Sequence, residues 1–158
     1  MSWVASIRYN RRMSGPTPVM IESDSPEATH TWAKNLAAGL RPPLVVALLG
    51  NLGAGKTQVA QGLAAGLGIT APVTSPTFTL INEYDLPAGG VLFHIDCYRL
   101  EKPVEEARNL GVEELFDQGI VLIEWADRIL PLLPAARLEI ELADAGPGRR
   151  RITLTNRR

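Results

Sequence analysis

The segment from Leu44 to Val59 constrains the fold of this chain more than any other part of it. An apolar, β-branched run ends at Gly50, and a glycine-rich stretch then leads to Lys56 and Thr57, in the pattern G-x-x-x-x-G-K-[ST]. The apolar run predicts a strand, and the leucine and valine spacing after the lysine predicts an amphipathic helix. A strand that passes through such a loop into a helix is the context in which this pattern binds nucleotide phosphates.

Each residue type in the loop has a chemical reason. Gly50, Gly53 and Gly55 let the backbone turn tightly, so that successive amides point inward and form a nest for phosphate oxygens. The helix that follows adds unpaired amides and the positive end of its dipole. Lys56 supplies a charge for the outer phosphates, and the Thr57 hydroxyl is placed to ligate Mg²⁺. The sequence therefore predicts a nucleoside triphosphate site. The absence of a guanine-reading N-K-x-D pattern favours ATP over GTP.

The remaining patterns predict an α/β fold in a single domain, with a P-loop NTPase-like mixed β-sheet flanked by helices. A first helix is expected from its N-cap, Ser25, to about Leu40, and a second from the end of the phosphate loop to residues 66–68. Two shorter helices are expected over 101–110 and 111–116. Strands are expected over 19–22, 44–49, 78–85, 91–96, 120–124, 137–142 and 151–156, with a helical stub over 128–133. We assign residues 18–158 to the ATPase domain and predict a disordered N-terminal extension over 1–17.

Composition narrows the class of protein. A chain of 158 residues with 46% hydrophobic and 21% charged residues is typical of one globular domain. The single cysteine, Cys97, excludes a disulfide framework and favours a reducing compartment. The sequence has no apolar run of the roughly 20 residues that cross a bilayer, and its opening residues lack the apolar core of a signal peptide. We therefore expect a cytoplasmic location and no membrane partner.

Positive charge is concentrated at the two ends of the chain. Residues 1–15 and 146–158 carry eight arginines and no acid, although the whole chain has a net charge of −1. Basic ends of this kind bind RNA phosphates in some proteins, and they are also typical of solvated termini. Solvated termini are the favoured interpretation.

Two acids follow predicted strands, at the edge where open α/β sheets bind ligands. Glu124 ends an apolar run typical of a central strand and is the better candidate for a magnesium ligand opposite Thr57. Asp96 ends another strand, and either a turn-initiating aspartate or a functional acid fits that position. His94 lies on the opposite strand face from Ile95, and without a partner motif it is expected to be structural.

Four motifs follow one another along the chain: G-N-L-G-A-G-K-T, S-P-T-F-T-L at Ser75–Leu80, H-I-D-C-Y-R-L at His94–Leu100, and the pair Glu124-Trp125. In this order and spacing they resemble the TsaE family, small bacterial ATPases that assist threonylcarbamoyladenosine synthesis on tRNA. The resemblance covers about residues 18–157. Three residues depart from the family's common choices: Asn51, Gln58 and Cys97. Asn51 and Cys97 leave the phosphate and metal ligands intact, whereas Gln58, in the first helical turn, would alter hydrolysis or affinity slightly.

This resemblance implies a Mg²⁺-dependent ATPase that acts on a heterodimer of TsaD and TsaB, with tRNA involved only indirectly. It implies catalytic roles for Lys56 and Asp96, and Mg²⁺ ligation by Thr57 and Glu124. The residues expected to bind ATP are Gly50, Asn51, Leu52, Gly53, Ala54, Gly55, Lys56, Thr57, Gln58, Ser25, Thr29, Thr77, Thr79 and Trp125. We expect slow hydrolysis by the isolated chain and faster hydrolysis with partners, because the motifs contain no obvious arginine finger; Arg99 or a partner residue would have to supply it.

Two other functions share the phosphate loop. A small-molecule kinase would use Arg149–Arg151 as a lid over its substrate. A non-hydrolysing, nucleotide-gated binding module would use ATP only to order the Ser75–Thr79 segment for a partner. Phosphorylated products would indicate the first, and tight Mg-ATP binding without phosphate release would indicate the second.

Overall fold

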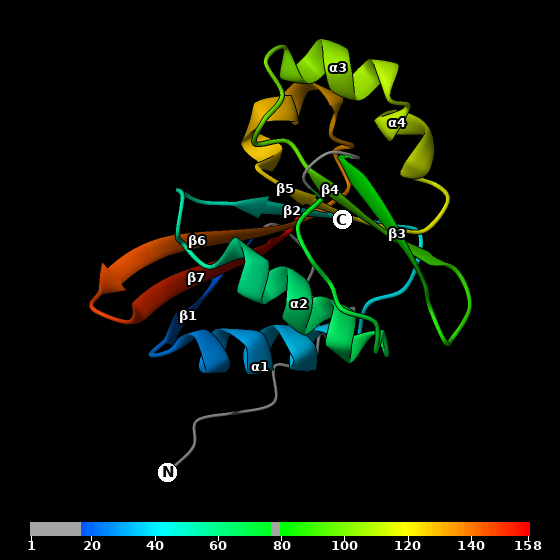
Figure 1. Cartoon of the computed structure of the whole chain (residues 1–158). Helices are drawn as coiled ribbons and strands as arrows, with labels where there is room; N and C mark the ends of the chain where they lie inside the picture. Colours follow the sequence, from blue (N-terminus) through cyan, green and yellow to red (C-terminus); the bar gives the residue numbers. More distant parts are fainter. Residues whose placement is uncertain (1–16, 77–79) are drawn as a thin grey trace.

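The computed structural model of the chain describes residues 17–76 and 80–158, which form one seven-stranded sheet with helices on both faces (Figure 1). The elements in chain order are β1 (Val19–Ser23), α1 (Pro26–Ala37), β2 (Leu44–Leu49), α2 (Lys56–Gly66), β3 (Ile81–Asp85), β4 (Val91–Asp96), α3 (Pro103–Asn109), α4 (Val112–Leu115), β5 (Ile120–Glu124), the 3-10 helix η1 (Ala126–Leu132), β6 (Leu138–Gly146) and β7 (Arg149–Asn156). The strand order is β1-β7-β6-β2-β5-β4-β3. Strands β6, β2, β5 and β4 run parallel, and the remaining strands pair antiparallel at the two edges. The predicted α/β single domain with a mixed sheet is confirmed.

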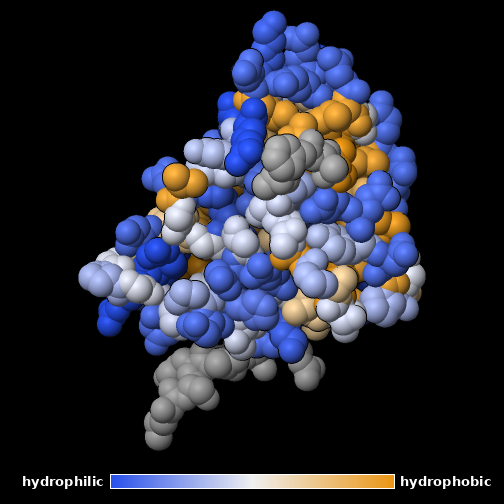
Figure 2. All heavy atoms as spheres, viewed as in Figure 1, coloured by the Kyte–Doolittle hydropathy of each residue, from blue (hydrophilic) through white to orange (hydrophobic). Residues whose placement is uncertain are grey.

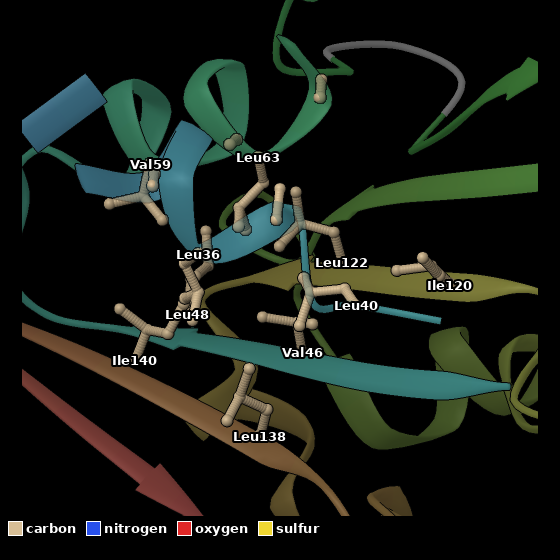
Figure 3. Close-up of a cluster of buried hydrophobic side chains, with 14 of the residues drawn as sticks. Leu36, Leu40, Val46, Leu48, Val59, Leu63, Ile120, Leu122, Leu138 and Ile140 are labelled. Atoms are coloured by element: carbon tan, nitrogen blue, oxygen red, sulfur yellow. The ribbon is translucent and has the colours of Figure 1, made fainter. Parts of the chain in front are cut away.

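The sheet separates two hydrophobic cores. One lies between the sheet and helices α1 and α2, where alternate residues of β2, β5 and β6 meet leucines of both helices (Figure 3). The other lies under α3, α4 and η1, and takes the opposite faces of β2, β4 and β5. Because β5 contributes to both cores, its run Ile120–Glu124 is buried at every position. This explains why it reads as a continuous apolar stretch and not as an alternating one.

Helix α2 is fixed in place by its close contact with α1. A Cβ added to Gly62 would lie 2.4 Å from the backbone oxygen of His30, and one added to Gly66 would lie 2.2 Å from that of Lys34. Only glycine allows the two backbones to approach so closely. Since α2 begins at Lys56, this contact also sets where the phosphate loop ends.

Several predicted boundaries shift. Helix α1 ends at Ala37 rather than Leu40, because Gly39 and two prolines follow and the last residues form single turns instead. Strand β3 begins at Ile81 rather than at residue 78, since Leu80 has a φ of +61° that interrupts an extended backbone. Strands β6 and β7 are longer than predicted and leave only a two-residue turn between Gly146 and Arg149.

The outer face shown in Figure 2 is mostly hydrophilic, and apolar atoms gather below α3 in its upper part. In the described part of the chain, none of the helices combines the length and apolar character needed to span a bilayer.

Candidate functional site

The carboxyl ends of three parallel strands meet at one edge of the sheet. In the register of the sheet, Glu124 at the end of β5 lies beside Leu48 of β2 on one side and Asp96 of β4 on the other. The two acids that the sequence singled out are therefore cross-strand neighbours. Strand β2 continues from this edge into the phosphate loop, so the acids and the loop share a crevice of the kind that binds ligands in α/β sheets.

The loop between β2 and α2 has the backbone conformation that its glycines predict. Gly50, Gly53 and Gly55 have φ values of +137°, +75° and +102°. A Cβ on Gly50 would lie 2.5 Å from the carbonyl oxygen of Leu142 in β6, so this position also requires glycine for space. The N-cap of α2 is Gly55, which provides no side-chain hydrogen bond, and the first amides of this helix are therefore available to an anion.

Lys56 is almost fully buried at the base of the loop. Its Nζ donates hydrogen bonds to the carbonyl oxygens of Gly50 at 2.6 Å and Asn51 at 2.7 Å. The same Nζ lies 4.0 Å from the centroid of the Trp125 ring, in a cation–π contact. Burial lowers the pKa of Lys56, and the nearby charge of Glu124 acts in the opposite direction. The structure thus holds the ammonium within the loop and puts the predicted residue Trp125 directly against it.

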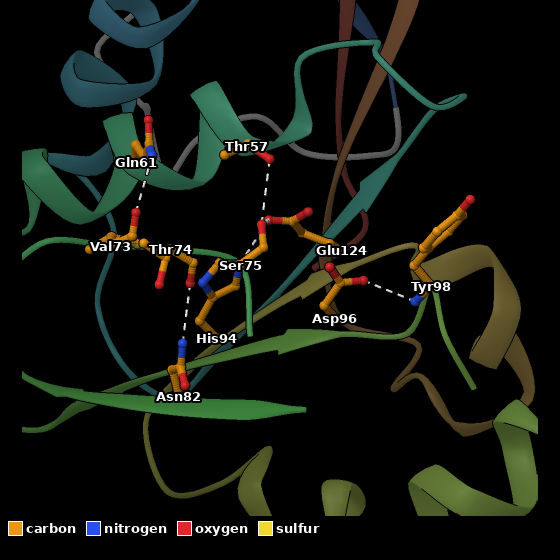
Figure 4. A network of polar contacts seen from close by, with 10 residues as sticks. All are labelled: Thr57, Gln61, Val73, Thr74, Ser75, Asn82, His94, Asp96, Tyr98 and Glu124. Atoms are coloured by element: carbon orange, nitrogen blue, oxygen red, sulfur yellow. Dashed lines mark hydrogen bonds and ion pairs between the residues drawn. The ribbon is translucent and has the colours of Figure 1, made fainter. Parts of the chain in front are cut away.

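Thr57 and Glu124 are connected through the hydroxyl of Ser75 (Figure 4). Ser75 Oγ lies 3.5 Å from Thr57 Oγ1 and donates to Glu124 Oε1 at 3.1 Å. Hydroxyl and carboxylate oxygens are the ligands that Mg²⁺ prefers, so this donor set fits the ion. Within residues 17–76 and 80–158, no group of three or more His, Cys, Asp or Glu side chains could hold a metal ion without other ligands. Water and phosphate oxygens would have to complete the coordination, as is usual for magnesium in nucleotide sites.

His94 belongs to the same network, through a partner that the sequence did not indicate. Its Nε2 lies 2.9 Å from Glu124 Oε1, and both side chains are buried. Alternation along β4 puts His94 and Asp96 on one face and Ile95 on the other, which the sequence does indicate. What the sequence lacks is the information that β5 lies next to β4.

Asp96 makes the contact of a turn-initiating aspartate, and its role as a functional acid stays a prediction. Its Oδ1 accepts the Tyr98 backbone N–H at 2.9 Å, as a turn-initiating aspartate does. It also lies beside Glu124 across the strand pair, and burial raises its pKa. Between these residues, the thiol of Cys97 is buried, which raises its pKa to about 12. The Tyr98 ring stacks on Trp125 at a centroid distance of 4.9 Å.

Two of the predicted nucleotide residues, Ser25 and Thr29, form hydrogen bonds at the start of α1. The Ser25 hydroxyl accepts the Ala28 N–H at 3.0 Å, and the buried Thr29 hydroxyl bonds with that of Ser23 at 2.7 Å. Both side chains thus stabilise the start of α1. Gln58 lies half-buried in the first turn of α2. Thr77 and Thr79 lie outside the described residues.

Arg150 contacts the phosphate loop, which the sequence did not reveal. Its Nη2 donates to the Gly53 carbonyl oxygen at 3.2 Å, and Nη1 lies 3.6 Å from an oxygen of Asp144. The run Arg149–Arg151 begins β7 and pairs in register with β6, so it belongs to the sheet and not to a mobile lid as a kinase would require. Only the arrangement of β6 and β7 beside the loop explains this contact.

Comparison with known proteins agrees with this geometry. The family profile described as threonylcarbamoyl adenosine biosynthesis protein TsaE matches residues 23–152. A Bacillus subtilis protein described as tRNA threonylcarbamoyladenosine biosynthesis protein TsaE is 48% identical over 134 residues, which cover 83% of this chain and 81% of that protein. A Treponema pallidum protein with the same description is 38% identical over 133 residues, or 84% of this chain and 96% of the relative.

A solved structure is also similar. The crystal structure of Bacillus subtilis YdiB superposes with a TM-score of 0.77 at 39% sequence identity, covering 92% of this chain and 89% of the other. The likeness therefore extends over nearly the whole of both chains.

Proposed function

The chain belongs to the TsaE family, whose role lies in tRNA threonylcarbamoyladenosine biosynthesis, and from this premise we propose that it binds and hydrolyses Mg-ATP in support of that modification. The observation that carries the proposal is the convergence of the Lys56 loop, the Thr57 hydroxyl and the Glu124 carboxylate on one crevice. A nest of amides with a lysine, a hydroxyl and an acid is the set of groups that phosphoryl transfer requires.

We infer a separate role in ATP binding or hydrolysis for each group of residues in the crevice. The loop amides and the start of α2 bind the phosphate oxygens, and Lys56 reaches the outer phosphates from its seat on the Gly50 and Asn51 carbonyls. Thr57 and Glu124 hold Mg²⁺, which when bound offsets negative charge on the phosphates. Asp96, whose pKa burial raises, orients the attacking water or accepts its proton. Catalysis of this kind depends on positioned charges and needs no covalent intermediate.

We further propose that the chain acts on a complex of TsaD and TsaB, with tRNA involved only indirectly. Membership of a family described by its role in threonylcarbamoyladenosine biosynthesis supports this proposal. The arginine found at the phosphate loop, Arg150, bonds to the Gly53 carbonyl oxygen, and we infer that a partner supplies the group that accelerates hydrolysis. The expected result is slow phosphate release by the isolated chain and faster release with the complex.

The binding step is tested by titrating ATP into the wild type and Lys56→Ala with and without Mg²⁺. Loss of a charged hydrogen-bond donor costs about 1.5–3 kcal/mol, so we expect affinity to fall by roughly 10- to 100-fold. Lys102→Ala is the matched control, because Lys102 is exposed near the start of α3. Unchanged affinity in the Lys56 variant would refute the assignment of the loop.

The hydrolysis step is tested by measuring phosphate release at saturating Mg-ATP, alone and with TsaB and TsaD. Asp96→Asn should bind Mg-ATP and release no phosphate above background. Tight binding with no release by the wild type in either condition would instead indicate a nucleotide-gated binding module.

A further inference from the structure

His94 is a buried side chain whose contacts point to a role in the site. It lies in β4 on the face that carries Asp96, and only 1% of its side chain is exposed. Its Nε2 lies 2.9 Å from Glu124 Oε1, and the side chain of Glu124 is itself 4% exposed. A buried carboxylate is costly unless it is hydrogen-bonded, and this contact gives Glu124 a buried hydrogen-bond partner.

The partners of the two ring nitrogens of His94 determine which tautomer of the imidazole is present. A carboxylate oxygen only accepts, so Nε2 must carry a proton and donate it to Oε1. Nδ1 is buried and has no hydrogen-bond partner within the described residues. A bare lone pair at Nδ1 costs less than an unpaired N–H would, and the tautomer that donates to Glu124 is therefore the one that the surroundings favour.

The same oxygen of Glu124 accepts a second bond, from Ser75 Oγ at 3.1 Å. Figure 4 shows Ser75 between Glu124 and Thr57, with His94 on the strand below. His94 and Ser75 together fix Oε1. Because Ser75 Oγ also lies 3.5 Å from Thr57 Oγ1, these two bonds hold the carboxylate at the end of β5 near Thr57.

We propose that His94 is the positioning residue for the Glu124 carboxylate, and that its Nε2–H bond keeps this carboxylate in the orientation that binds a divalent cation together with Thr57. The inference rests on the proposed role of Glu124 as a metal ligand. Groups that orient metal ligands typically change metal affinity by 10- to 100-fold when they are removed. The histidine would act on the metal only through Glu124 and would not contact nucleotide.

Two substitutions of similar polarity separate positioning from packing. In His94→Gln, the side-chain nitrogen stands as many bonds from Cβ as Nε2 does and can donate to Glu124. In His94→Asn, the nitrogen corresponds in position to Nδ1 and falls short of Oε1. Both variants introduce an amide at the same buried site, so a purely structural role would affect them alike.

The experiment measures the Kd of a fluorescent ADP derivative in Mg²⁺ and in EDTA for the wild type, both His94 variants and Glu124→Gln. The ratio of the two Kd values reports the contribution of the metal. We expect this ratio to be kept in His94→Gln, and to fall at least tenfold in His94→Asn and Glu124→Gln, with the Kd in EDTA unchanged in the two His94 variants. A wild-type ratio in His94→Asn would overturn the inference, and so would an equal loss in the Gln and Asn variants.

A measurement on the unmodified chain keeps the test valid if the Asn variant fails to fold. The chain has two histidines, so ¹H–¹⁵N correlation spectra of the imidazoles are simple, and His30→Gln identifies the second set of signals. We expect the Nε2–H tautomer at His94, and the Nδ1–H tautomer would overturn the inference. If magnesium does not affect nucleotide affinity in either the wild type or Glu124→Gln, the metal role of Glu124 fails, while the spectra still decide whether His94 donates to it.

Discussion

Replacing Gly62 by alanine should destabilise the protein, although alanine normally favours a helix. Gly62 lies inside α2, where the added Cβ would be 2.4 Å from the His30 carbonyl oxygen and 2.7 Å from the Ala33 Cβ. Ordinary contacts of a Cβ begin at about 3.4 Å, so the helices would have to separate by about 1 Å. A gap of that size forfeits between a quarter and half of each dispersion contact along the interface.

The magnitude follows from two opposing terms. Overpacking costs about 1–3 kcal/mol, and the upper end applies because a backbone oxygen cannot rotate away as a side chain can. The gain in helix propensity is about 1 kcal/mol. The net expectation is a loss of about 2 kcal/mol, or a Tm lower by roughly 4–8 °C for a domain of this size.

Urea unfolding followed by circular dichroism measures this change directly. With a typical slope of about 2 kcal/mol/M, the midpoint should fall by about 1 M without a change in slope. Thr31→Ala is the matched control, because Thr31 is exposed on α1 near the contact and its replacement should raise stability by a few tenths of a kcal/mol. Equal or greater stability of Gly62→Ala would show that the close helix contact does not govern this position.

Three more predictions concern the site and its surroundings. Asp96→Asn keeps an oxygen for the Tyr98 N–H but removes a carboxylate whose pKa is raised by burial. Because ionisation of such a carboxylate opposes folding above about pH 4, the variant should have a higher Tm than the wild type at pH 7. Thermal scans should show that this advantage is lost near pH 3. Arg150→Ala should weaken ADP binding by about threefold to tenfold, since it removes one hydrogen bond to the loop, whereas Arg151→Ala should not; equal affinities in calorimetry would contradict this. Burial raises the pKa of Cys97 to about 12, so its thiol should resist iodoacetamide at pH 8 until urea unfolds the chain; rapid labelling of the native protein would disprove the burial. The stability of the protein should also fall as the pH rises above about 9, because the thiol then ionises only in the unfolded state.

The sequence predicted the glycine-rich turn after β2 and the start of α2 because both structures are local. The turn, the amide nest and the start of α2 follow from glycines and a lysine within eight positions, and they depend on no distant pairing. The buried run of β5 was equally clear, since a strand covered on both faces needs apolar residues throughout. The α/β class follows from the order of such elements.

The contacts that complete the site are not local. The bond between His94 and Glu124 depends on which strand lies beside β4, and 30 residues separate the two side chains in the chain. Trp125 reaches Lys56 because it turns out of β5 with a φ of +57°, which no propensity of tryptophan predicts. The contact of Arg150 with Gly53 requires the β6–β7 hairpin to lie beside the loop, across 97 positions of sequence.

The contact between the Lys56 ammonium and the Trp125 indole gives the molecule a built-in optical probe. The emission of an indole responds to a charge 4.0 Å from its ring, and a polyphosphate that draws the ammonium toward itself would alter that emission. Occupancy could then be followed in real time without a dye, once Trp32 of α1 is replaced by phenylalanine to reduce the background. The residue that stacks on the lysine would thus report each arrival and departure at the crevice.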